Sequence, residues 1–378
     1  MADRKTGLGM KECADIVIIG AGIAGISAGA RLSSHADVIV LEREPVPGMH
    51  ATGRSAATYI RNYGNATLRA LNAASHADLA TPLPEFSEAG FLSPRGLLYL
   101  AKPEDSAALD DELDDAKGMQ EITVEEATRH FPILRPGLFS RAAIEPDASD
   151  IDVDRLMQSF LRQMRAAGGR LVTEVEVLGL HRVGGNWQIE TTTGSYVAPT
   201  VVNAAGAWAD LIGLMAGARA KGLVPKRRSA ALLPFADRDV THWPLVASIA
   251  EDWYAKPDAG RLLVSPADQD PVAPMDAWPD EMVLAEGLHR FELATQVSVT
   301  RIEHKWAGLR TFAPDKTPVV GFDPDVQDFF WLAGQGGYGI QTAPALSQIA
   351  ADLVMSGTTE VVEPTIVSNL SPAREAVR

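Results

Sequence analysis

The stretch from Asp15 to Glu42 constrains the fold of this chain most. It reads as an apolar strand, then the turn Gly-Ala-Gly-Ile-Ala-Gly over residues 20–25, then a helix rich in small residues and a second apolar strand that ends at Glu42. The free N–H groups at the start of such a helix favour phosphate. An acid about 20 residues after the turn can meet a ribose hydroxyl. The pattern predicts a Rossmann unit that binds a dinucleotide.

Each glycine of the turn has its own predicted task. Gly20 allows the tight turn, Gly22 lets the backbone approach a pyrophosphate, and Gly25 lets the helix pack close to the strand. A glycine triplet alone would also fit an ordinary β–α connection. The flanking strands and the acid favour the dinucleotide.

Composition limits the class of protein. The chain has 378 residues, 46% hydrophobic and 22% charged, which is typical of a soluble globular protein with two intertwined domains. A formal net charge of −15 argues against nucleic acid and against an acidic membrane face as partners. The single cysteine, Cys13, leaves no internal disulfide and no thiolate metal site, and it favours a reducing, cytoplasmic location. No run reaches the ~20 apolar residues of a membrane span.

Periodicity and turn residues predict the elements. Residues 1–14 are expected to form a polar leader outside regular structure. Helices are expected at residues 66–80, 106–117, 123–130, 152–167, 207–216, 281–294 and 340–355, and strands at residues 97–101, 170–177, 180–183, 187–192, 201–206 and 329–333. Residues 226–301 look β-rich, and dinucleotide-like elements bracket them.

The predicted fold is therefore α/β with an α+β part. A Rossmann-type domain is discontinuous, over residues 1–95, 150–222 and 305–378. A β-sheet-rich second domain takes residues 96–149 and 223–304. Strands that run into glycines recur at residues 203–206 and 334–337. FAD is long and touches several strand ends, so these recurrences favour FAD over NAD, although the same glycines could serve turns only.

Nine stretches, in order over nearly the whole chain, carry a family resemblance. They are residues 20–25, 41–44, 52–57, 92–95, 202–208, 225–229, 256–260, 306–310 and 335–341. With them the chain resembles the FAD-dependent D-amino acid oxidase and dehydrogenase superfamily, and within it bacterial D-arginine dehydrogenase. The resemblance implies flavin-dependent oxidative deamination of D-amino acids to 2-oxo acids and ammonia, with a quinone or oxygen as electron acceptor and a lean toward dehydrogenase.

The resemblance also implies the residues of a non-covalent FAD site. Glu42 suits ribose hydroxyls, Thr52 and Ser55 can donate to phosphates or flavin edges, and the amides of the 336–337 glycines can face the flavin pyrimidine oxygens. Cys13 is a poor candidate for a covalent link. The predicted cofactor residues are Gly20, Gly22, Ala24, Gly25, Glu42, Arg43, Ala51, Thr52, Gly53, Arg54, Ser55, Ala56, Ala57, Thr58, Val177, Ala205, Gly336, Gly337, Tyr338, Gly339, Ile340 and Gln341.

An amino acid substrate needs a partner for its carboxylate, and an arginine fork binds a carboxylate in a bidentate manner. Arg228 and Arg310 match the carboxylate-binding arginines of the family. Tyr63 and Tyr254 match its lid and pocket tyrosines, and the Gly337 carbonyl matches an acceptor for the substrate amine. Hydride transfer from Cα needs no protein base, so His50, His242 and His304 are interpreted as structural, and no metal-ligand spacing appears.

The chain departs from the arginine-preferring members in the side-chain pocket. Leu97 stands where those members have a glutamate that pairs with the guanidinium, and Thr58 and Ile60 replace a histidine and a threonine. An unpaired guanidinium in an apolar pocket would cost several kcal/mol. We therefore expect D-amino acids with apolar or uncharged side chains. Two alternatives stay open: oxidation of sarcosine, glycine or another secondary amine, and a flavin- or nucleotide-binding module without turnover.

Overall fold

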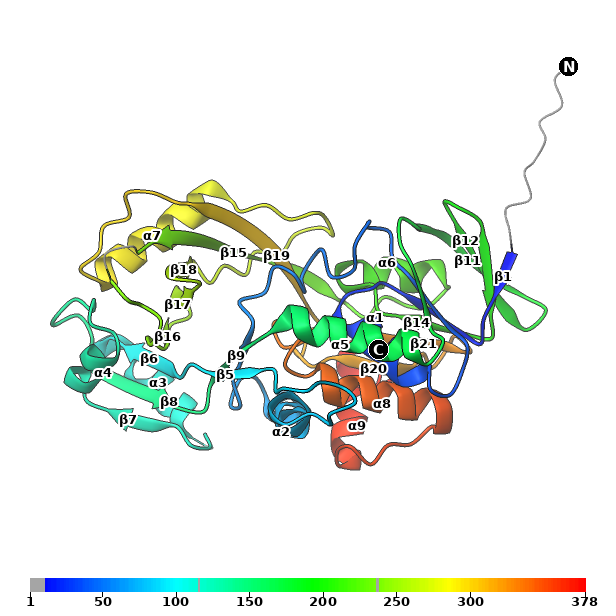
Figure 1. Cartoon of the computed structure of the whole chain (residues 1–378), viewed down its shortest axis with the longest axis horizontal. Helices are drawn as coiled ribbons and strands as arrows, with labels where there is room; N and C mark the ends of the chain where they lie inside the picture. Colours follow the sequence, from blue (N-terminus) through cyan, green and yellow to red (C-terminus); the bar gives the residue numbers. More distant parts are fainter. Residues whose placement is uncertain (1–10, 115, 236–237) are drawn as a thin grey trace, which may run out of the picture.

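A six-stranded, mostly parallel sheet forms one half of the molecule (Figure 1). The computed structural model describes residues 11–114, 116–235 and 238–378. The strand order is β10 (Arg170–Val172), β3 (Val38–Leu41), β2 (Ile16–Ile19), β14 (Thr200–Asn203), β21 (Phe329–Ala333) and β20 (Val319–Phe322). Only β20 runs antiparallel to its neighbour in this sheet. Strands from distant parts of the chain therefore lie side by side in one sheet.

The two faces of this sheet are covered differently. Strand β2 is buried throughout, and its alternate residues enter two separate cores. Ile16 and Ile18 pack toward helices α1 (Ile23–Leu32), α2 (Ala66–Ala80), α5 (Val153–Ala166) and α8 (Ala343–Ser356). Val17 and Ile19 pack toward helix α6 (Ala209–Met215) and a four-stranded sheet.

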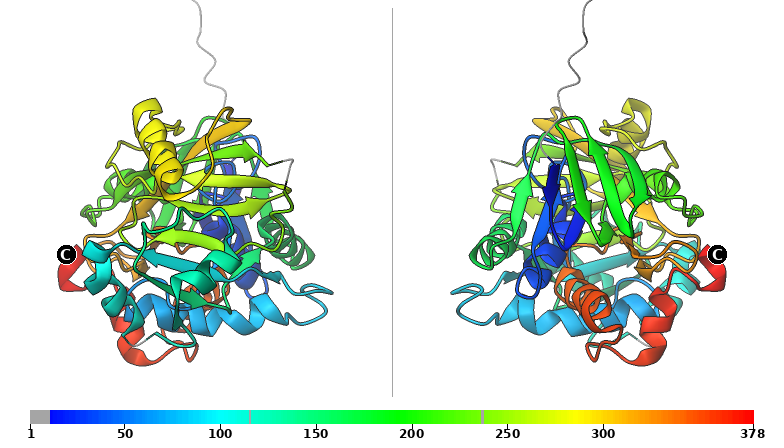
Figure 2. Two further views of the ribbon diagram at one scale, coloured as in Figure 1. Left: turned by 90° about the vertical axis from the view of Figure 1, so that its left-hand side faces the viewer. Right: turned by 90° about the vertical axis from the view of Figure 1, so that its right-hand side faces the viewer.

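The four-stranded sheet lies at one end of the molecule, where Figure 2 (right) shows it facing the viewer. Its order is β1 (Lys11–Cys13), β13 (Ser195–Ala198), β12 (Asn186–Thr191) and β11 (Val177–Val183). Trp187 and Ile189 on β12 are fully buried against the six-stranded sheet. The first half is thus a three-layer arrangement of helices, a mostly parallel sheet and a mostly antiparallel sheet.

The other half is built on an eight-stranded sheet. Its order is β19 (His304–Phe312), β15 (Val224–Pro234), β18 (Arg261–Ser265), β17 (Tyr254–Asp258), β16 (Leu245–Ser248), β6 (Leu97–Ala101), β8 (Arg141–Glu145) and β7 (Gln120–Ile122). Helices α3 (Ser106–Leu113), α4 (Val124–His130) and α7 (Glu281–Ala294) accompany it. Strands β15 and β19 reach from this half toward the six-stranded sheet (Figure 1).

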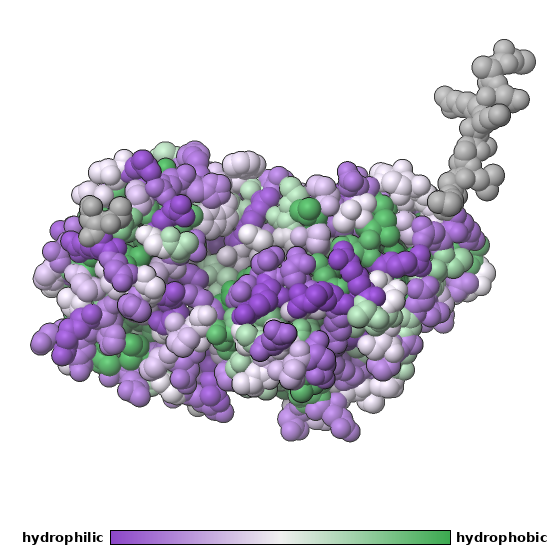
Figure 3. Space-filling model, viewed as in Figure 1, coloured by the Kyte–Doolittle hydropathy of each residue, from purple (hydrophilic) through white to green (hydrophobic). Residues whose placement is uncertain are grey.

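Smaller elements complete the fold. A three-stranded sheet of β4 (Thr58–Tyr59), β9 (Ser149–Ile151) and β5 (Leu92–Pro94) lies where the chain crosses between the halves. Helix α9 (Pro364–Leu370) and 3-10 turns η1 (Pro103–Asp105), η2 (Gly206–Trp208) and η3 (Glu375–Val377) are the remaining named elements. Hydrophilic residues predominate on the face in Figure 3, with apolar residues in small groups. Among the described helices, none has the length and apolar character that crossing a bilayer requires.

Three expectations about the elements are wrong. The leader is not loose throughout, because residues 11–13 pair in parallel with β13, which the sequence reading missed; residues 1–10 lie outside the described part. The expected strand over residues 170–177 is two strands in two different sheets, and Glu174 between them has a φ of 59°. The closing helix begins at Ala343, because residues 334–342 stay in turns.

Candidate active site

A cavity of about 370 Å³ opens at the carboxyl ends of the parallel strands. Open α/β sheets place ligands at this edge. One wall comes from the turns that follow β2, β3, β14 and β21, and the other comes from β15, β17, β18 and β19 of the eight-stranded sheet. The size is within the range of ligand-binding pockets. The site therefore lies between the two halves.

The glycine turn has the geometry that its pattern predicts. A Cβ on Gly25 would lie 1.9 Å from the carbonyl oxygen of Gly20, so helix and strand meet too closely for any side chain. Gly20 has a φ of +102°. Gly22 differs, because a Cβ there would meet only Thr52 Oγ1 at 3.5 Å. Packing within the protein would therefore accept a small side chain at position 22. The reason for a glycine lies in the cavity, because a side chain there would take space from a ligand.

Polar groups around the turn are arranged for phosphate and ribose. Glu42 accepts hydrogen bonds from the amides of Ala21, at 2.7 Å, and Glu44, at 3.0 Å, which hold its carboxylate at the cavity. The Ile23 amide donates to Thr52 Oγ1 at 3.0 Å. Within the described residues, the next amides of α1, those of Ala24 and Gly25, donate to no protein acceptor, so they remain available to an anion.

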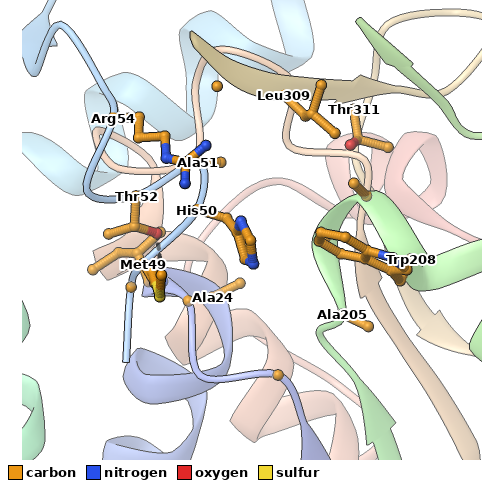
Figure 4. A pocket seen from close by; sticks show the side chains of 18 of the residues that line it. Ala24, Met49, His50, Ala51, Thr52, Arg54, Ala205, Trp208, Leu309 and Thr311 are labelled. Carbon is orange, nitrogen blue, oxygen red and sulfur yellow. Dashed lines mark hydrogen bonds between the residues drawn. The ribbon is translucent and has the colours of Figure 1, made fainter. Parts of the chain in front are cut away.

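Aromatic and charged side chains also line the cavity near Glu42. Figure 4 shows His50 and Trp208 as neighbours in the cavity lining, with ring centroids 5.0 Å apart. The Arg43 guanidinium lies 3.9 Å from the Trp208 ring centroid, and His50 Nε2 lies 2.8 Å from Glu44 Oε1. Burial acts to raise the pKa of Glu44, but His50 and Arg43 outweigh it and hold that pKa below its usual range.

Two arginines of neighbouring strands point into the other end of the cavity. Arg228 on β15 is paired with Gly308 on β19, so Arg310 lies diagonally opposite on the same face. Arg228 Nε donates to the Asp268 carbonyl at 2.9 Å, and its guanidinium lies 5.8 Å from the Tyr254 ring centroid. Among the described residues, neither Arg228 nor Arg310 forms a salt bridge with a carboxylate. The pair therefore presents unneutralised positive charge.

Ionisation of the neighbouring groups reflects this charge. Burial and the charge of Arg310 lower the pKa of Arg228. Burial also opposes the charge on Arg310, but the hydroxyls of Tyr63, Tyr254 and Tyr338 outweigh it and raise the pKa of Arg310. For Tyr254, burial is outweighed by both guanidiniums, so its pKa falls below the usual value. The cluster favours a bound anion.

A second cavity, of about 110 Å³, adjoins the arginine pair. Ser55, Ala56, Arg228, Tyr254, Arg310, Gly337 and Ile340 line both cavities. The residues predicted for the side-chain pocket, Thr58, Ile60 and Leu97, all line the second one, together with Tyr63, Tyr99, Leu245 and Trp253. Leu97, Ile60 and Leu245 pack in one apolar cluster. Glu251 is the one carboxylate among its lining residues and is exposed.

Most predicted cofactor residues line one of the two cavities. Ala57, Thr58 and Gln341 border only the second, while Gly25, Gly53 and Tyr338 border neither. Gly53 faces the carbonyl of Gly48, and Tyr338 is buried against Tyr63 and Phe312. These three shape the backbone or the packing of the site instead of facing it.

Sequence reasoning missed part of the first cavity. His50 was interpreted as structural, but it lines the cavity, whereas His242 and His304 are exposed and border neither cavity. The structure adds Met49, Glu176, Trp208, Gly308 and Thr311 to the lining. Thr311 Oγ1 is buried and has no hydrogen-bond partner among the described residues. His50 is separated from the glycine turn by a loop without a clear pattern, so no sequence signal marked it.

A family model described as "FAD dependent oxidoreductase" (DAO) matches residues 15–353. The chain belongs to the DAO family of FAD-dependent oxidoreductases. It is therefore an enzyme of this class, and FAD is its cofactor. The resemblance seen in the sequence is confirmed at the level of this family.

The residues of this DAO-family chain fit FAD. The open space at Gly22, the free amides at the start of α1 and the carboxylate of Glu42 suit the adenosine diphosphate half. The unpartnered Thr311 hydroxyl and the Gly337 amide, which donates to no acceptor among the described residues, suit a polar ring edge. The expectation for Gly336 is wrong, because its amide already donates to the Thr311 carbonyl at 2.8 Å. FAD bound there would supply an electron acceptor next to the arginine pair.

Relatives support the family and the fold. The human mitochondrial dimethylglycine dehydrogenase is 24% identical over 389 residues, covering 92% of this chain, which spans 43% of that protein's length. Glycine oxidase from Geobacillus kaustophilus superposes with a TM-score of 0.84 at 23% identity, covering 96% of this chain and 99% of that one. L-proline dehydrogenase from P.horikoshii superposes with a TM-score of 0.82 at 24% identity, covering 96% and 98%. At these identities the structural likeness concerns the fold.

Proposed function

We propose that this enzyme oxidatively deaminates D-amino acids with apolar or uncharged side chains to 2-oxo acids and ammonia, with hydride transfer from Cα to FAD. The observation that carries the proposal is the arginine pair, which lacks a carboxylate partner among the described residues and lies where the two cavities meet. An α-amino acid brings the missing carboxylate.

The surrounding residues divide the remaining tasks. Arg228 and Arg310 bind the substrate carboxylate, and Tyr63 and Tyr254 close the space around it. The Gly337 carbonyl accepts a hydrogen bond from the substrate amine and thereby orients Cα toward the cofactor. Displacement of water from this buried cluster strengthens the arginine–carboxylate interaction. The chain supplies binding and orientation, which is what this chemistry requires from the protein.

The second cavity supports the side-chain preference. Leu97 is fully buried there and packs with Ile60 and Leu245, so an apolar side chain would bury its surface against theirs. A guanidinium in the same place would lack a partner at Leu97, which distinguishes this chain from the D-arginine dehydrogenases that it resembles.

A second candidate function is oxidation of a secondary amino acid such as sarcosine, or of glycine. Its support is the likeness to a dimethylglycine dehydrogenase, a glycine oxidase and an L-proline dehydrogenase. Such substrates carry the same carboxylate and would use the same arginines. These substrates differ from the proposed D-amino acids because they carry a substituent on nitrogen or, in glycine, have no side chain.

Anaerobic reduction of the flavin separates these functions. The holoenzyme is mixed without oxygen with D-Met, D-Leu, D-Phe, D-Arg, D-Lys, their L-enantiomers, glycine, sarcosine and L-proline, and flavin bleaching is followed. We expect the apolar D-amino acids to bleach fastest. Faster bleaching by D-Arg or D-Lys would contradict the side-chain preference, and bleaching by sarcosine or glycine alone would select the second function. Later mixing with oxygen or a quinone identifies the electron acceptor.

A further inference from the structure

The loop that carries Tyr63, residues 60–63, is held by side chains from three elements. Asn72 on α2 is completely buried, and its Nδ2 donates to three carbonyls of this loop. The acceptors are Ile60 and Arg61, each at 3.3 Å, and Tyr63 at 3.1 Å. One amide side chain therefore satisfies most carbonyls of an irregular segment.

Gln341 holds the start of the same loop. It comes from the turn segment before α8 and is 3% exposed. Its Oε1 accepts from the Ile60 amide at 3.1 Å, and its Nε2 donates to Asn72 Oδ1 at 2.7 Å. The side chain of Gln341, expected from the resemblance to serve the cofactor, is thus bonded to the Tyr63 loop and to Asn72.

Glu145 holds the loop from the eight-stranded sheet. It lies on β8 and is 1% exposed, and its Oε1 accepts from the amides of Arg61 at 3.0 Å and Asn62 at 3.4 Å. Asn62 adds a second connection to this half: its side chain exchanges two hydrogen bonds with the main chain of Lys117, at 2.9 and 3.0 Å. The loop is therefore fastened to both halves of the molecule.

We propose that Asn72, Glu145 and Gln341 form a buried clamp that keeps Tyr63 as a fixed wall of the substrate cavity. They are positioning residues, because they act through Tyr63, whose ring packs 4.7 Å from that of Tyr338 and whose hydroxyl favours the charged form of Arg310. The inference rests on the proposed function for its kinetic consequence. The rigidity of the loop is independent of it.

Glu145 offers a matched pair of variants. Its Oε2 is buried and has no partner among the described residues, and burial raises the pKa of Glu145 despite the hydrogen bonds from Asn62 and Arg61. Only the acceptor at Oε1 serves the loop, so Glu145→Gln keeps the interaction. Glu145→Leu keeps a similar volume and removes the acceptor, which leaves two buried amides without a partner.

Limited trypsin digestion measures the rigidity of the loop without reference to activity. Arg61 is exposed, but its following peptide bond is fixed through the Asn62 amide. The holoenzyme is digested, and cleavage after Arg61 is followed by mass spectrometry. We expect this cleavage to be about tenfold faster in Glu145→Leu than in the wild type and unchanged in Glu145→Gln.

Hydrogen exchange tests the loop in the wild type and needs no variant. The amides of Arg61 and Asn62 should be protected from exchange. If these amides exchange as fast as those of the exposed Gly184–Gly185 turn, the proposal is overturned. This measurement decides on the proposal even when Glu145→Leu does not fold.

Kinetics connect the clamp to the substrate. With the best substrate of the panel, Glu145→Leu should raise KM about tenfold and leave kcat within about twofold, and Glu145→Gln should restore KM. In a Tyr63→Ala background the effect of Glu145→Leu on KM should shrink, because the clamp acts through the Tyr63 side chain. Equal effects in both backgrounds, or an unchanged KM in Glu145→Leu, would overturn the proposal. If no amino acid is turned over, the proposed function fails, while digestion and exchange still decide on the clamp.

Discussion

Arg228 and Arg310 show how much a site can depend on single residues. Each guanidinium is desolvated beside the other, which costs energy unless an anion binds. The nearby hydroxyls of Tyr63 and Tyr254 reduce this cost without cancelling the charge. In the proposed function a substrate carboxylate would complete the cluster, and the relief of repulsion between the two cations would then contribute to substrate binding.

Replacing Arg310 tests this directly. Arg310→Leu should lower kcat/KM by about 30-fold or more, because breaking a buried charge pair costs about 2–5 kcal/mol. Arg310→Lys should lose less, since it keeps the charge but not the fork. The same order is expected for the affinity of benzoate, measured by its perturbation of the flavin spectrum. Arg219→Leu is the control, because Arg219 is 68% exposed and pairs with Asp325. Wild-type benzoate affinity in Arg310→Leu would contradict the assignment.

At the scale of the element, the glycine turn between β2 and α1 combines packing with ligand binding. Gly25→Ala places a Cβ against the Gly20 carbonyl and should lower the Tm of the apoprotein by several degrees, as overpacking costs about 1–3 kcal/mol. Gly22→Ala meets only the Thr52 hydroxyl and should leave that Tm nearly unchanged while weakening FAD binding about tenfold or more. Thermal melting of the apoprotein and titration with FAD separate the two effects. Equal losses of apoprotein stability would refute this division.

At the scale of the whole molecule, one cavity lies between two sheets. The first cavity takes its walls from the six-stranded and the eight-stranded sheet, and beside it Asp276 forms an ion pair with Arg54 at 2.5 Å. FAD at 100 times its Kd should therefore stabilise the protein by about 2.7 kcal/mol. FMN lacks the adenosine end that the glycine turn and Glu42 are placed to hold, so it should raise the Tm far less at the same concentration. Equal shifts from FMN and FAD in differential scanning fluorimetry would contradict this placement.

Local patterns predicted the elements that carry their own signals. Helix α2 has the bounds that its sequence indicates, because Asn65 caps it and its apolar residues recur with helical spacing. The strand expected over residues 170–177 shows the limit. Strand β10 ends at Val172 and β11 begins at Val177, with Glu174 in a left-handed conformation between them, and the two strands pair with β3 and β12. Pairing is a tertiary choice that a single sequence does not display.

The residues of the candidate site also fall into those that the sequence predicted and those that it did not. The glycine turn, Glu42, the arginines and Leu97 were predicted from the sequence, because each belongs to a short pattern or to a family resemblance. His50, Trp208 and Thr311 were not, because they enter the cavity only through the arrangement of the loops. Glu145 is the clearest case: it is cross-strand to Leu97 and beneath the Tyr63 loop, although 48 residues separate it from Leu97.

The sequence by itself determined the strand, turn and helix of the dinucleotide motif and the FAD-dependent class, and it singled out the two arginines that we propose to bind a carboxylate. These depend on local backbone chemistry and on side-chain types, which are written in the order of residues. Only the tertiary structure decided that the two arginines share one face, that an apolar cavity adjoins them and that buried side chains from distant segments clamp the Tyr63 loop. Such features arise when packing and hydrogen-bond satisfaction bring together residues that no local pattern relates.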